Sequence, residues 1–244
     1  MPTKSTLNKV KNLHQKKFRE RFGEFIVEGI KGVVEAINSD AEIYRIFATE
    51  AVLEQIKIPT RIEKEIITEK EGRQISDAET FSGILAVVAI PNEVNFSAGD
   101  IICMDRMADP GNLGTIIRTA DWFGIKNILL SENCVDPYNP KVVRSTMGSI
   151  FRVNIMKSAE LVRSLEELKN KGYNIISLTM DGKDISELKI DDKKNIYVFG
   201  SESHGVRDDI VQMGESYAIF GKGSAESLNV AVAAGIVLNR IVNP

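Results

Sequence analysis

Residues 100–121 read DIICMDRMADPGNLGTIIRTAD, and the fold prediction starts from them. The first six residues, 100–105, are mostly apolar and have the length of a buried strand. A turn containing Pro110 and Gly111 follows, and from Leu113 the apolar side chains recur at helical spacing to residue 123. A strand that leads through a turn into a helix is the repeating unit of α/β proteins.

Strands and helices alternate in the same way through the rest of the chain. Strands are expected at residues 127–130, 151–155, 173–178, 196–199 and 217–220, and helices at 140–147, 158–171 and 228–241, with Ser158 as the cap of the second helix. Apolar strands that alternate with helices are typical of a parallel sheet covered by helices on both faces. We therefore predict an α/β fold with a parallel sheet in this part of the chain.

A smaller α/β part precedes this sheet. The pattern predicts helices at residues 5–22, 30–38, 50–56 and around 77–81, and strands at 25–27, 43–48 and 84–90. Pro91 and the turn-rich residues 97–100 separate the two parts. We therefore predict two domains, 1–95 and 96–244.

The composition excludes several classes of protein. With 43% hydrophobic and 27% charged residues, the chain is neither disordered nor fibrous. Its longest apolar runs, Ile84–Ile90 and Val230–Leu238, are far shorter than the roughly 18 residues of a membrane span. The first residues lack the apolar core of a secretory signal. Two cysteines and two histidines supply neither a disulfide framework nor a metal centre. We expect a cytoplasmic protein without a membrane or metal partner.

The N-terminal residues are basic although the whole chain is not. The formal net charge is −3, yet residues 1–31 contain eight basic and three acidic side chains. Five of the basic side chains lie along one predicted helix: Lys11, Lys16, Lys17, Arg19 and Arg21. Such a cluster suits the phosphates of a nucleic acid. It also occurs as an ordinary solvated helix face, which the sequence taken alone slightly favours.

Three glycine-containing junctions between a strand and a helix are the candidate sites, because ligands of parallel sheets lie beyond the carboxyl ends of the strands. In the first junction, Asn112 can cap the helix that follows. Arg118 falls at the edge of the apolar face of that helix, where an unpaired guanidinium is costly. It either forms an ion pair with Asp121 or presents a fixed fork to phosphate or ribose oxygens.

The second junction reads VFGSESHG (198–205), and the third reads IFGKGSAESLNVAVAA (219–234). Glu202 in the second disfavours a bare phosphate and suits a cationic or hydroxyl-bearing ligand. In the third, Ser227 can cap the last helix, and Asn229 adds a second polar group at the start of a helix that must be buried on most sides. The GxGxxG fingerprint of dinucleotide sites is absent from the sequence.

Together these stretches resemble the three sequence motifs of the SpoU (TrmH-like) branch of the SPOUT methyltransferases. The matching positions are Asn112, Gly114 and Arg118 in the first motif, Gly200, Glu202 and Gly205 in the second, and Ser227, Leu228, Asn229 and Val230 in the third. Residues 141–148 also look like the family, and the basic helix followed by residues 23–29 is similar to a substrate-RNA-binding domain found in many members. The third motif departs from the family at Phe220, Gly221 and Ala231, which puts the affinity for the methyl donor in doubt.

The resemblance implies a fold, an activity and partners. The implied fold is a SPOUT domain with a deep trefoil knot, preceded by a small α/β RNA-binding domain. The implied activity is the methylation of a ribose 2′-hydroxyl in RNA, more often ribosomal than transfer RNA, with S-adenosylmethionine as the donor. A homodimer that packs through the C-terminal helix is also implied.

The resemblance also assigns roles to single residues. It implies catalytic roles for Arg118, Glu202, Ser227 and Asn229, and donor binding by backbone groups near Gly200, Ile219 and Leu228. Asn112, Arg144 and the five basic residues of the N-terminal helix are expected to contact the RNA. Because a guanidinium stays protonated, we expect Arg118 to orient a phosphate and stabilise the attacking oxygen rather than act as a base.

Two other classes of function remain open at this point. A non-catalytic RNA-binding protein of the same fold would have no need of Arg118, Glu202 and Asn229, which are present. An α/β enzyme that binds a small nucleotide at the glycine loops is disfavoured by the basic N-terminal helix and by the missing dinucleotide fingerprint.

Overall fold

The computed structural model describes residues 2–92, 94–190 and 194–243. It divides into two compact units, one formed by residues 1–93 with 136–152 and the other by 94–135 with 153–244. Residues 136–152 therefore pack with the N-terminal unit, whereas the sequence placed them in the second domain. The assignment of residues 1–95 and 96–244 to two functional domains stays a prediction. Each unit is described by itself.

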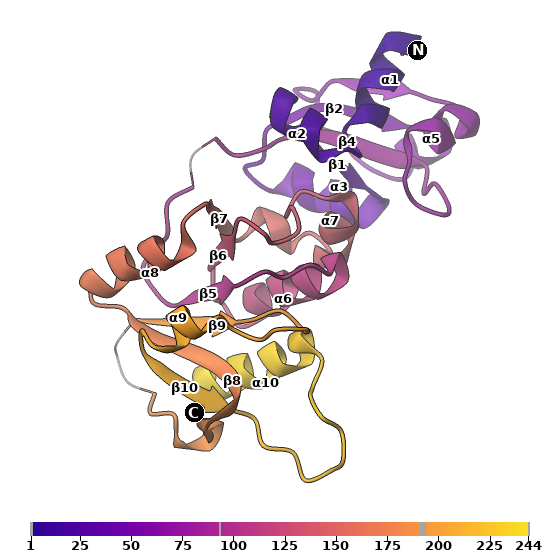
Figure 1. Ribbon diagram of the computed structural model, residues 1–244. Helices are drawn as coiled ribbons and strands as arrows, with labels where there is room; N and C mark the ends of the chain where they lie inside the picture. Colours follow the sequence, from indigo (N-terminus) through magenta and orange to yellow (C-terminus); the bar gives the residue numbers. More distant parts are fainter. Residues whose placement is uncertain (1, 93, 191–193, 244) are drawn as a thin grey trace. The chain divides into compact units, whose positions relative to one another are not determined.

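The second unit contains a six-stranded sheet in the order β10-β8-β9-β5-β6-β7 (Figure 1). Its strands are β5 (Ile101–Met104), β6 (Asn127–Ser131), β7 (Asn154–Ser158), β8 (Asn174–Asp184), β9 (Asn195–Phe199) and β10 (Glu215–Ala218). Every pairing is parallel, with Ile101 opposite both Asn127 and Ile196. The prediction of an α/β fold with a parallel sheet is confirmed.

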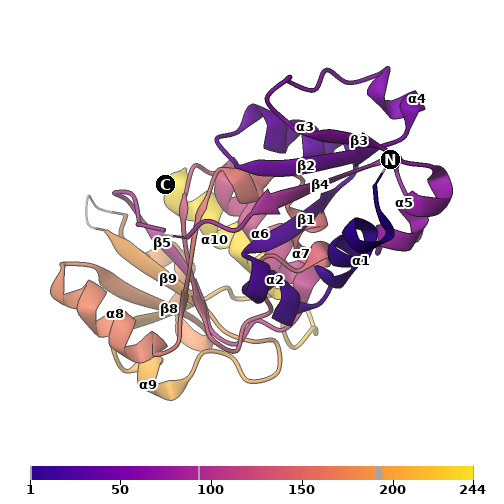
Figure 2. The ribbon, with the colours of Figure 1, turned by 90° about the horizontal axis from the view of Figure 1, so that it is seen from above.

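Helices cover both faces of this sheet, as Figure 2 shows. They are α6 (Pro110–Trp122), α8 (Leu161–Asn170), α9 (Asp208–Val211) and α10 (Val230–Val242), with a short 3₁₀ turn, η2 (Ile185–Glu187). Leu165 of α8 and Ile210 of α9 pack with Cys103 and Val198, which lie on one face of the sheet. Successive side chains of a strand point to opposite faces, so the neighbouring residues of β5 and β9 face the other layer. There α6 packs against α10.

The first unit has a four-stranded sheet in the order β1-β4-β2-β3. Its strands are β1 (Glu24–Glu28), β2 (Ile43–Ala48), β3 (Lys64–Ile66) and β4 (Ile84–Ala89), and β4 runs antiparallel to both β1 and β2. Its helices are α1 (Lys4–Asn12), α2 (Lys16–Phe22), α3 (Ile30–Asn38), α4 (Glu50–Leu53), α5 (Glu69–Ile75) and α7 (Pro140–Thr146), with the 3₁₀ turn η1 (Ser149–Phe151). Helix α7 packs against β1, which attaches residues 136–152 to this unit.

The single helix predicted at residues 5–22 is wrong, because the chain breaks between α1 and α2. The guanidinium of Arg19 donates hydrogen bonds to the carbonyls of Leu13 (2.8 Å) and His14 (2.9 Å). In a continuous helix these carbonyls would accept from backbone N–H groups four residues later. Hydrogen bonds from the buried Arg19 side chain therefore replace the backbone hydrogen bonds of one helical turn. The spacing of apolar residues could not predict this break.

Three other predicted elements need correction. The helix expected near residues 77–81 lies instead at α5, where Thr68 and Glu71 form a capping box. The strand expected at 151–155 is β7, which begins at Asn154 because η1 occupies the preceding residues. Ser158 is the last residue of β7, and Glu160 is the N-cap of α8. No helix in the described parts of the chain is long and apolar enough to span a membrane.

Candidate functional site

A chain of side-chain hydrogen bonds joins the three glycine-containing junctions of the second unit. The amide nitrogen of Asn112 donates to the carboxylate of Glu202, and the amide nitrogen of Asn229 donates to the Asn112 carbonyl oxygen over 3.1 Å. These pairs are separated by 90 and 117 residues in sequence. The junctions follow β5, β9 and β10, so this group lies where parallel sheets bind their ligands.

The side chain of Asn112 is not needed to cap helix α6 and can therefore bond to the other two junctions. Asp109 is the N-cap of this helix and accepts a 2.7 Å hydrogen bond from the backbone N–H of Asn112. Pro110, in the first turn, has no N–H that needs a partner. The prediction that Asn112 caps the helix is therefore wrong. Asp109 performs that role, and the Asn112 amide points to the other two junctions.

Asn229 caps the last helix. Its side-chain oxygen accepts hydrogen bonds from the backbone N–H groups of Ala231 (2.9 Å) and Val232 (3.3 Å). With the oxygen held in this way, the amide nitrogen is turned toward Asn112. The prediction that Ser227 is the cap is wrong, since Ser227 lies two residues before the N-cap and is exposed.

The loop that carries Glu202 is closed on itself. The backbone N–H of Gly205 donates to the carbonyl of Ser201 over 2.9 Å, and Gly205 has a φ of +63°. A Cβ atom on Gly200 would lie 1.9 Å from the carbonyl carbon of Gly205, so no larger residue fits there. Glu202 is thereby held at the exposed tip of a tight turn.

A buried carboxylate that the sequence analysis did not single out supports this loop. Asp105, directly after β5, is fully buried, and its oxygens lie 3.3 Å from Nε of Arg106 and 3.3 Å from Nε of Arg207. Arg106 also donates to the carbonyl of Gly205 over 3.3 Å. Buried charges are stable only when paired, so Asp105 connects the end of β5 to the Glu202 loop. An acidic residue directly after an apolar strand was the available signal.

Arg118 lies on the exposed face of α6 and not at the edge of its buried face as predicted. Within the described residues, no hydrogen bond or ion pair holds its guanidinium, so the expected alternative of an ion pair with Asp121 is not found. The structure does not bring Arg118 into the hydrogen-bonded group of Asn112, Glu202 and Asn229. Its guanidinium is open to a ligand.

The segment before α10 presents free backbone groups. Residues 220–229 are exposed, with Phe220 at 60% and Leu228 at 48% of their full exposure. Among the residues with described positions, no backbone hydrogen bond involves residues 219–228. Free N–H and C=O groups beside apolar side chains suit a small ligand that has both an apolar part and hydrogen-bonding groups. No cluster of three or more His, Cys, Asp or Glu in the described chain could hold a metal ion.

The basic residues of the N-terminal helices divide into two kinds. Lys11, Lys16, Lys17 and Arg21 are exposed, and Lys16 forms an ion pair with Glu20 at 3.4 Å. Arg19 is 2% exposed and forms a 2.5 Å ion pair with Asp136 in the same unit. Arg19 therefore cannot contact RNA phosphates as predicted, because its guanidinium is a buried structural group. Arg144 is half-buried and lies 3.6 Å from Glu28.

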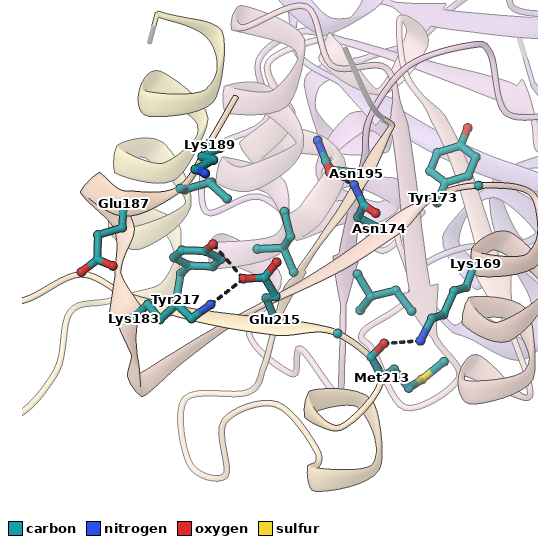
Figure 3. Close-up of a pocket in the computed structure, with 15 residues that line it drawn as sticks. Lys169, Tyr173, Asn174, Lys183, Glu187, Lys189, Asn195, Met213, Glu215 and Tyr217 are labelled. Atoms are coloured by element: carbon teal, nitrogen blue, oxygen red, sulfur yellow. Dashed lines mark hydrogen bonds and ion pairs between the residues drawn. The ribbon is translucent and has the colours of Figure 1, made fainter. Parts of the chain in front are cut away.

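A cavity of about 780 Å³ opens at strand β10 and the amino-terminal ends of β8 and β9 (Figure 3). Three of its charged side chains have hydrogen-bond partners within the lining. Glu215 accepts hydrogen bonds from Lys183 (2.7 Å) and Tyr217 (3.1 Å), and Lys169 donates to the carbonyl of Met213 (2.6 Å). None of the predicted site residues lines it. Its position at the amino-terminal ends of two strands is not where parallel sheets bind their substrates.

Two family models match the chain. Residues 100–239 match the SpoU rRNA Methylase family, and residues 4–86 match the MRM3-like substrate binding domain. The chain is 31% identical over 230 residues to the 23S rRNA (guanosine(2553)-2'-O)-methyltransferase RlmP of Bacillus subtilis, covering 93% of this chain and 92% of that protein. It is 32% identical over 174 residues to the mitochondrial rRNA methyltransferase 3 of Xenopus laevis, covering 66% of this chain and 41% of the relative.

Solved structures show the same similarity. A protein of the TrmH family from Porphyromonas gingivalis superposes with a TM-score of 0.91 at 30% identity, covering 99% of this chain and 98% of that one. An AdoMet-bound rRNA methyltransferase from Sinorhizobium meliloti superposes with a TM-score of 0.86 at 25% identity, covering 99% and 96% of the two chains. The structural similarity thus extends over nearly the whole length of both solved chains.

Proposed function

The chain belongs to the SpoU rRNA methylase family, and from this premise we propose that it transfers the methyl group of S-adenosylmethionine to a ribose 2′-hydroxyl of ribosomal RNA. The observation that carries the proposal is the hydrogen-bonded group of Glu202, Asn112 and Asn229, which unites three distant motifs at one end of a parallel sheet. The RNA methyltransferases named among the relatives and the AdoMet bound by a solved relative support it.

The methyl donor is held by the segment before α10 and by the Glu202 loop. Backbone groups near Gly200, Ile219 and Leu228 form hydrogen bonds with it, and the half-exposed Leu228 covers its apolar part. When bound, S-adenosylmethionine supplies a methyl group that an oxygen nucleophile can displace in line. The chain itself contributes orientation, which can supply much of the rate enhancement of a two-substrate reaction.

Arg118 acts on the RNA. Its guanidinium is exposed and unengaged among the described residues, so it can reach a phosphate next to the target ribose. A guanidinium is a cationic hydrogen-bond donor and not a base, so this side chain orients that phosphate and stabilises negative charge on the attacking oxygen.

The hydrogen-bonded group of Asn112, Glu202 and Asn229 orients the two reactants, which are the methyl donor and the RNA. Glu202 keeps a carboxylate at the turn tip, and the Asn112 amide fixes its position by donating a hydrogen bond to it. Asn229 couples that arrangement to the start of α10. The exposed hydroxyl of Ser227 binds a ribose or phosphate oxygen. Lys11, Lys16, Lys17, Arg21 and Arg144 hold the RNA backbone without reading its sequence.

The assembly is a homodimer that packs through α10. Val232 (52% exposed), Ile236 (40%) and Val242 (43%) form an apolar stripe along this helix. Apolar stripes of this kind mark protein interfaces. The chain path of the second unit is a deep trefoil knot, as in the family, and the protein acts in the cytoplasm, where ribosomal RNA is modified.

The test is methyl transfer from labelled S-adenosylmethionine to total RNA of a strain that lacks the protein, followed by mapping of 2′-O-methyl positions. A single new methylated ribose in ribosomal RNA supports the proposal. Methylation of a transfer RNA instead would identify transfer RNA as the substrate. No incorporation and no donor binding would point to a non-catalytic RNA-binding protein.

The residue assignment has its own test in Arg118→Ala. Removal of a group that stabilises transition-state charge typically lowers the rate by about 100- to 1,000-fold, so single-turnover methylation should fall by this amount while the Kd for RNA stays within a few fold. Arg163→Ala is the matched control, because Arg163 is exposed on α8 and, within the described residues, pairs only with Glu160 and Glu167. Lost RNA binding with a normal single-turnover rate would contradict the assignment.

A further inference from the structure

Helix α6 has a solvent-facing side that includes an aromatic ring. Residues three or four positions apart lie on the same side of a helix, and the exposed residues Thr115, Arg118 and Trp122 have this spacing. The opposite side of the helix, which includes Leu113 and Ile117, is buried. Thr115, Arg118 and Trp122 therefore form one exposed row, called here the α6 strip.

Trp122 is the most exposed of the large apolar side chains in the described residues. It is 84% exposed, and the next, Met180, is 70% exposed. Within the described chain, the indole of Trp122 makes no aromatic or cation–π contact and donates no hydrogen bond. Tryptophan combines a large apolar face with one N–H donor and is enriched where proteins contact partners. An indole that the fold leaves without contacts therefore indicates a contact surface.

The charge beside Trp122 on the α6 strip indicates the kind of partner. Arg118 precedes Trp122 by four residues, which is about 6 Å along the helix axis. No hydrogen bond or ion pair holds its guanidinium among the residues with described positions. Long side chains of a helix lean toward its amino terminus, so we expect the indole over the turn that carries Arg118. A free cation and a free aromatic face in adjacent turns match the phosphate and the base of a nucleic acid.

The α6 strip lies on the helix that begins at the candidate site. Asn112, which bonds to Glu202 and Asn229, is in the first turn of α6. At 1.5 Å per residue, Arg118 lies about 9 Å and Trp122 about 15 Å farther along the helix axis. Trp122 is therefore beyond the phosphate assigned to Arg118 when viewed from the site. Its ring is placed for the base of a flanking nucleotide rather than for the reacting ribose.

A second copy of the chain suits the α6 strip less well. It would bury the guanidinium of Arg118, and an unpaired charge inside an interface is costly. The side chains of α10 that are assigned to the dimer, such as Val232 and Ile236, are aliphatic and uncharged. RNA offers an anion and an aromatic face together, so it provides a partner for both groups of the strip.

We propose that the indole of Trp122 stacks on a base of the substrate RNA, in a nucleotide that flanks the methylated ribose. Arg118 binds the phosphate between the two nucleotides, and the stacked base fixes the direction in which the strand runs along α6. Stacking uses the face of a base, which all four bases have, so this contact positions the strand without selecting its sequence. The proposal rests on the proposed function only in that RNA is the substrate.

The fluorescence of Trp122 tests the contact directly, because it is the only tryptophan in the chain. The probe is ribosomal RNA from a strain that lacks the protein. Inorganic polyphosphate is the control, since it has negative charges but no bases. Stacking on a base quenches an indole. We expect ribosomal RNA to quench the emission, and polyphosphate to leave it unquenched both when added alone and when it displaces the RNA.

Two substitutions localise the contact. Trp122→Ala removes the ring, and the loss of one stacked base should raise the Kd for ribosomal RNA about tenfold in filter binding at one fixed salt concentration. Trp122→Phe keeps an aromatic face, so its Kd should stay within about threefold. Met180→Ala is the matched control, since Met180 is an exposed apolar residue on β8. Exposed side chains without contacts contribute little to stability, so all three variants should keep the melting temperature of the unmodified protein.

Steady-state methyl transfer supplies a readout that a structural role would not produce. A stacked flanking base is bound equally in the ground state and in the transition state, so Trp122→Ala should raise the KM for RNA and leave kcat within about twofold. Trp122→Phe should restore most of the KM. A fall in kcat with an unchanged KM would contradict the assignment.

The remaining outcomes separate this inference from the proposed function. RNA binding that leaves the Trp122 emission unchanged, or an unchanged Kd for Trp122→Ala, would overturn the stacking contact. Emission typical of a buried indole in the RNA-free protein, moving to longer wavelength on dilution, would assign Trp122 to a contact between two copies and would also overturn it. If the protein methylates ribosomal RNA in these cases, the proposed function stands alone. Quenching that requires bases, without any methyl transfer, would keep the stacking contact and remove the activity.

Discussion

At the scale of single residues, Asn112 holds the candidate site together because it uses both ends of its amide. The NH₂ group donates to Glu202 and the carbonyl accepts from Asn229. A side chain with only donors or only acceptors could not serve both neighbours. Asp105 has a comparable role below the site, where it pairs with Arg106 and Arg207 at the base of the Glu202 loop.

Asn112→Asp tests that dual use. The new carboxylate can still accept from Asn229 but would face Glu202 as a like charge, so the loop should turn away. Loss of a hydrogen bond to a charged group costs about 1.5–3 kcal/mol, and we expect kcat/KM for methyl transfer to fall by roughly 10- to 100-fold. Asn133→Asp, in an exposed loop, is the control. An unchanged kcat/KM would show that Asn112 does not contribute to methyl transfer.

At the scale of elements, the residue that begins α10 contributes both to the stability of this helix and to the candidate site. Asn229 satisfies two backbone N–H groups of the helix and also reaches Asn112. Ser227, which the sequence pattern favoured as the cap, bonds to neither. Single substitutions can therefore distinguish the roles of Asn229 and Ser227.

Asn229→Ala should lower the free energy of unfolding by about 1 kcal/mol, the usual cost of a lost N-cap, and should also lower methyl transfer. Ser227→Ala should leave the free energy of unfolding within about 0.5 kcal/mol, as for exposed residues without partners. Urea denaturation followed by circular dichroism measures both. A larger loss for Ser227→Ala than for Asn229→Ala would contradict the cap assignment.

The packing of residues 136–152 on β1 has a signature at alkaline pH. The Tyr138 ring lies 4.9 Å from that of Phe25, and burial raises the pKa of Tyr138 from 10.0 to about 12. The folded state therefore holds this proton more tightly than the unfolded chain. Its contribution to stability is complete below pH 10 and is lost as the pH rises from about 10 through about 12.

Tyr138→Phe should make the free energy of unfolding less steeply dependent on pH over this window. Denaturation series at pH 9, 10 and 11 measure the slope, with Tyr173→Phe, a tyrosine of the other unit, as the control. An identical slope for Tyr138→Phe and the unmodified protein would show that Tyr138 ionises as freely as in the unfolded chain.

At the scale of the whole molecule, the proposed dimer depends on the exposed side of α10. One side of this helix packs against α6, and the other carries Val232, Ile236 and Val242. Exposed apolar side chains gathered on one side of a helix commonly mark a surface that a second chain covers.

Ile236→Glu should convert the dimer to a monomer, because a carboxylate would be buried in the interface without a partner. Sedimentation velocity measures the change. Met180→Glu is the control, since Met180 is 70% exposed and lies on strand β8 rather than on α10. A monomeric unmodified protein, or a dimer that survives Ile236→Glu, would contradict the interface.

Local patterns in the sequence sufficed for most of the strands and for the order of the motifs, although β3 was not predicted and β7 was placed too early. The apolar run before Asp105 predicted β5, and the helical spacing from Leu113 predicted α6, because a strand or helix shows its buried face within a few residues. The parallel sheet followed from their alternation. Local spacing failed where a distant residue intervened, as at the break before α2, where Arg19 takes the carbonyls that would have continued the helix.

The sequence by itself therefore determined the α/β class, the parallel sheet and the family. Only the tertiary structure decided which polar residues meet. It joined Asn112 to Glu202 and Asn229, buried Arg19 against Asp136, and placed Asp105 under the Glu202 loop. These pairs are up to 117 residues apart. No periodicity in the chain can encode such contacts, because they form only when the strands have been ordered and the loops brought to one edge of the sheet.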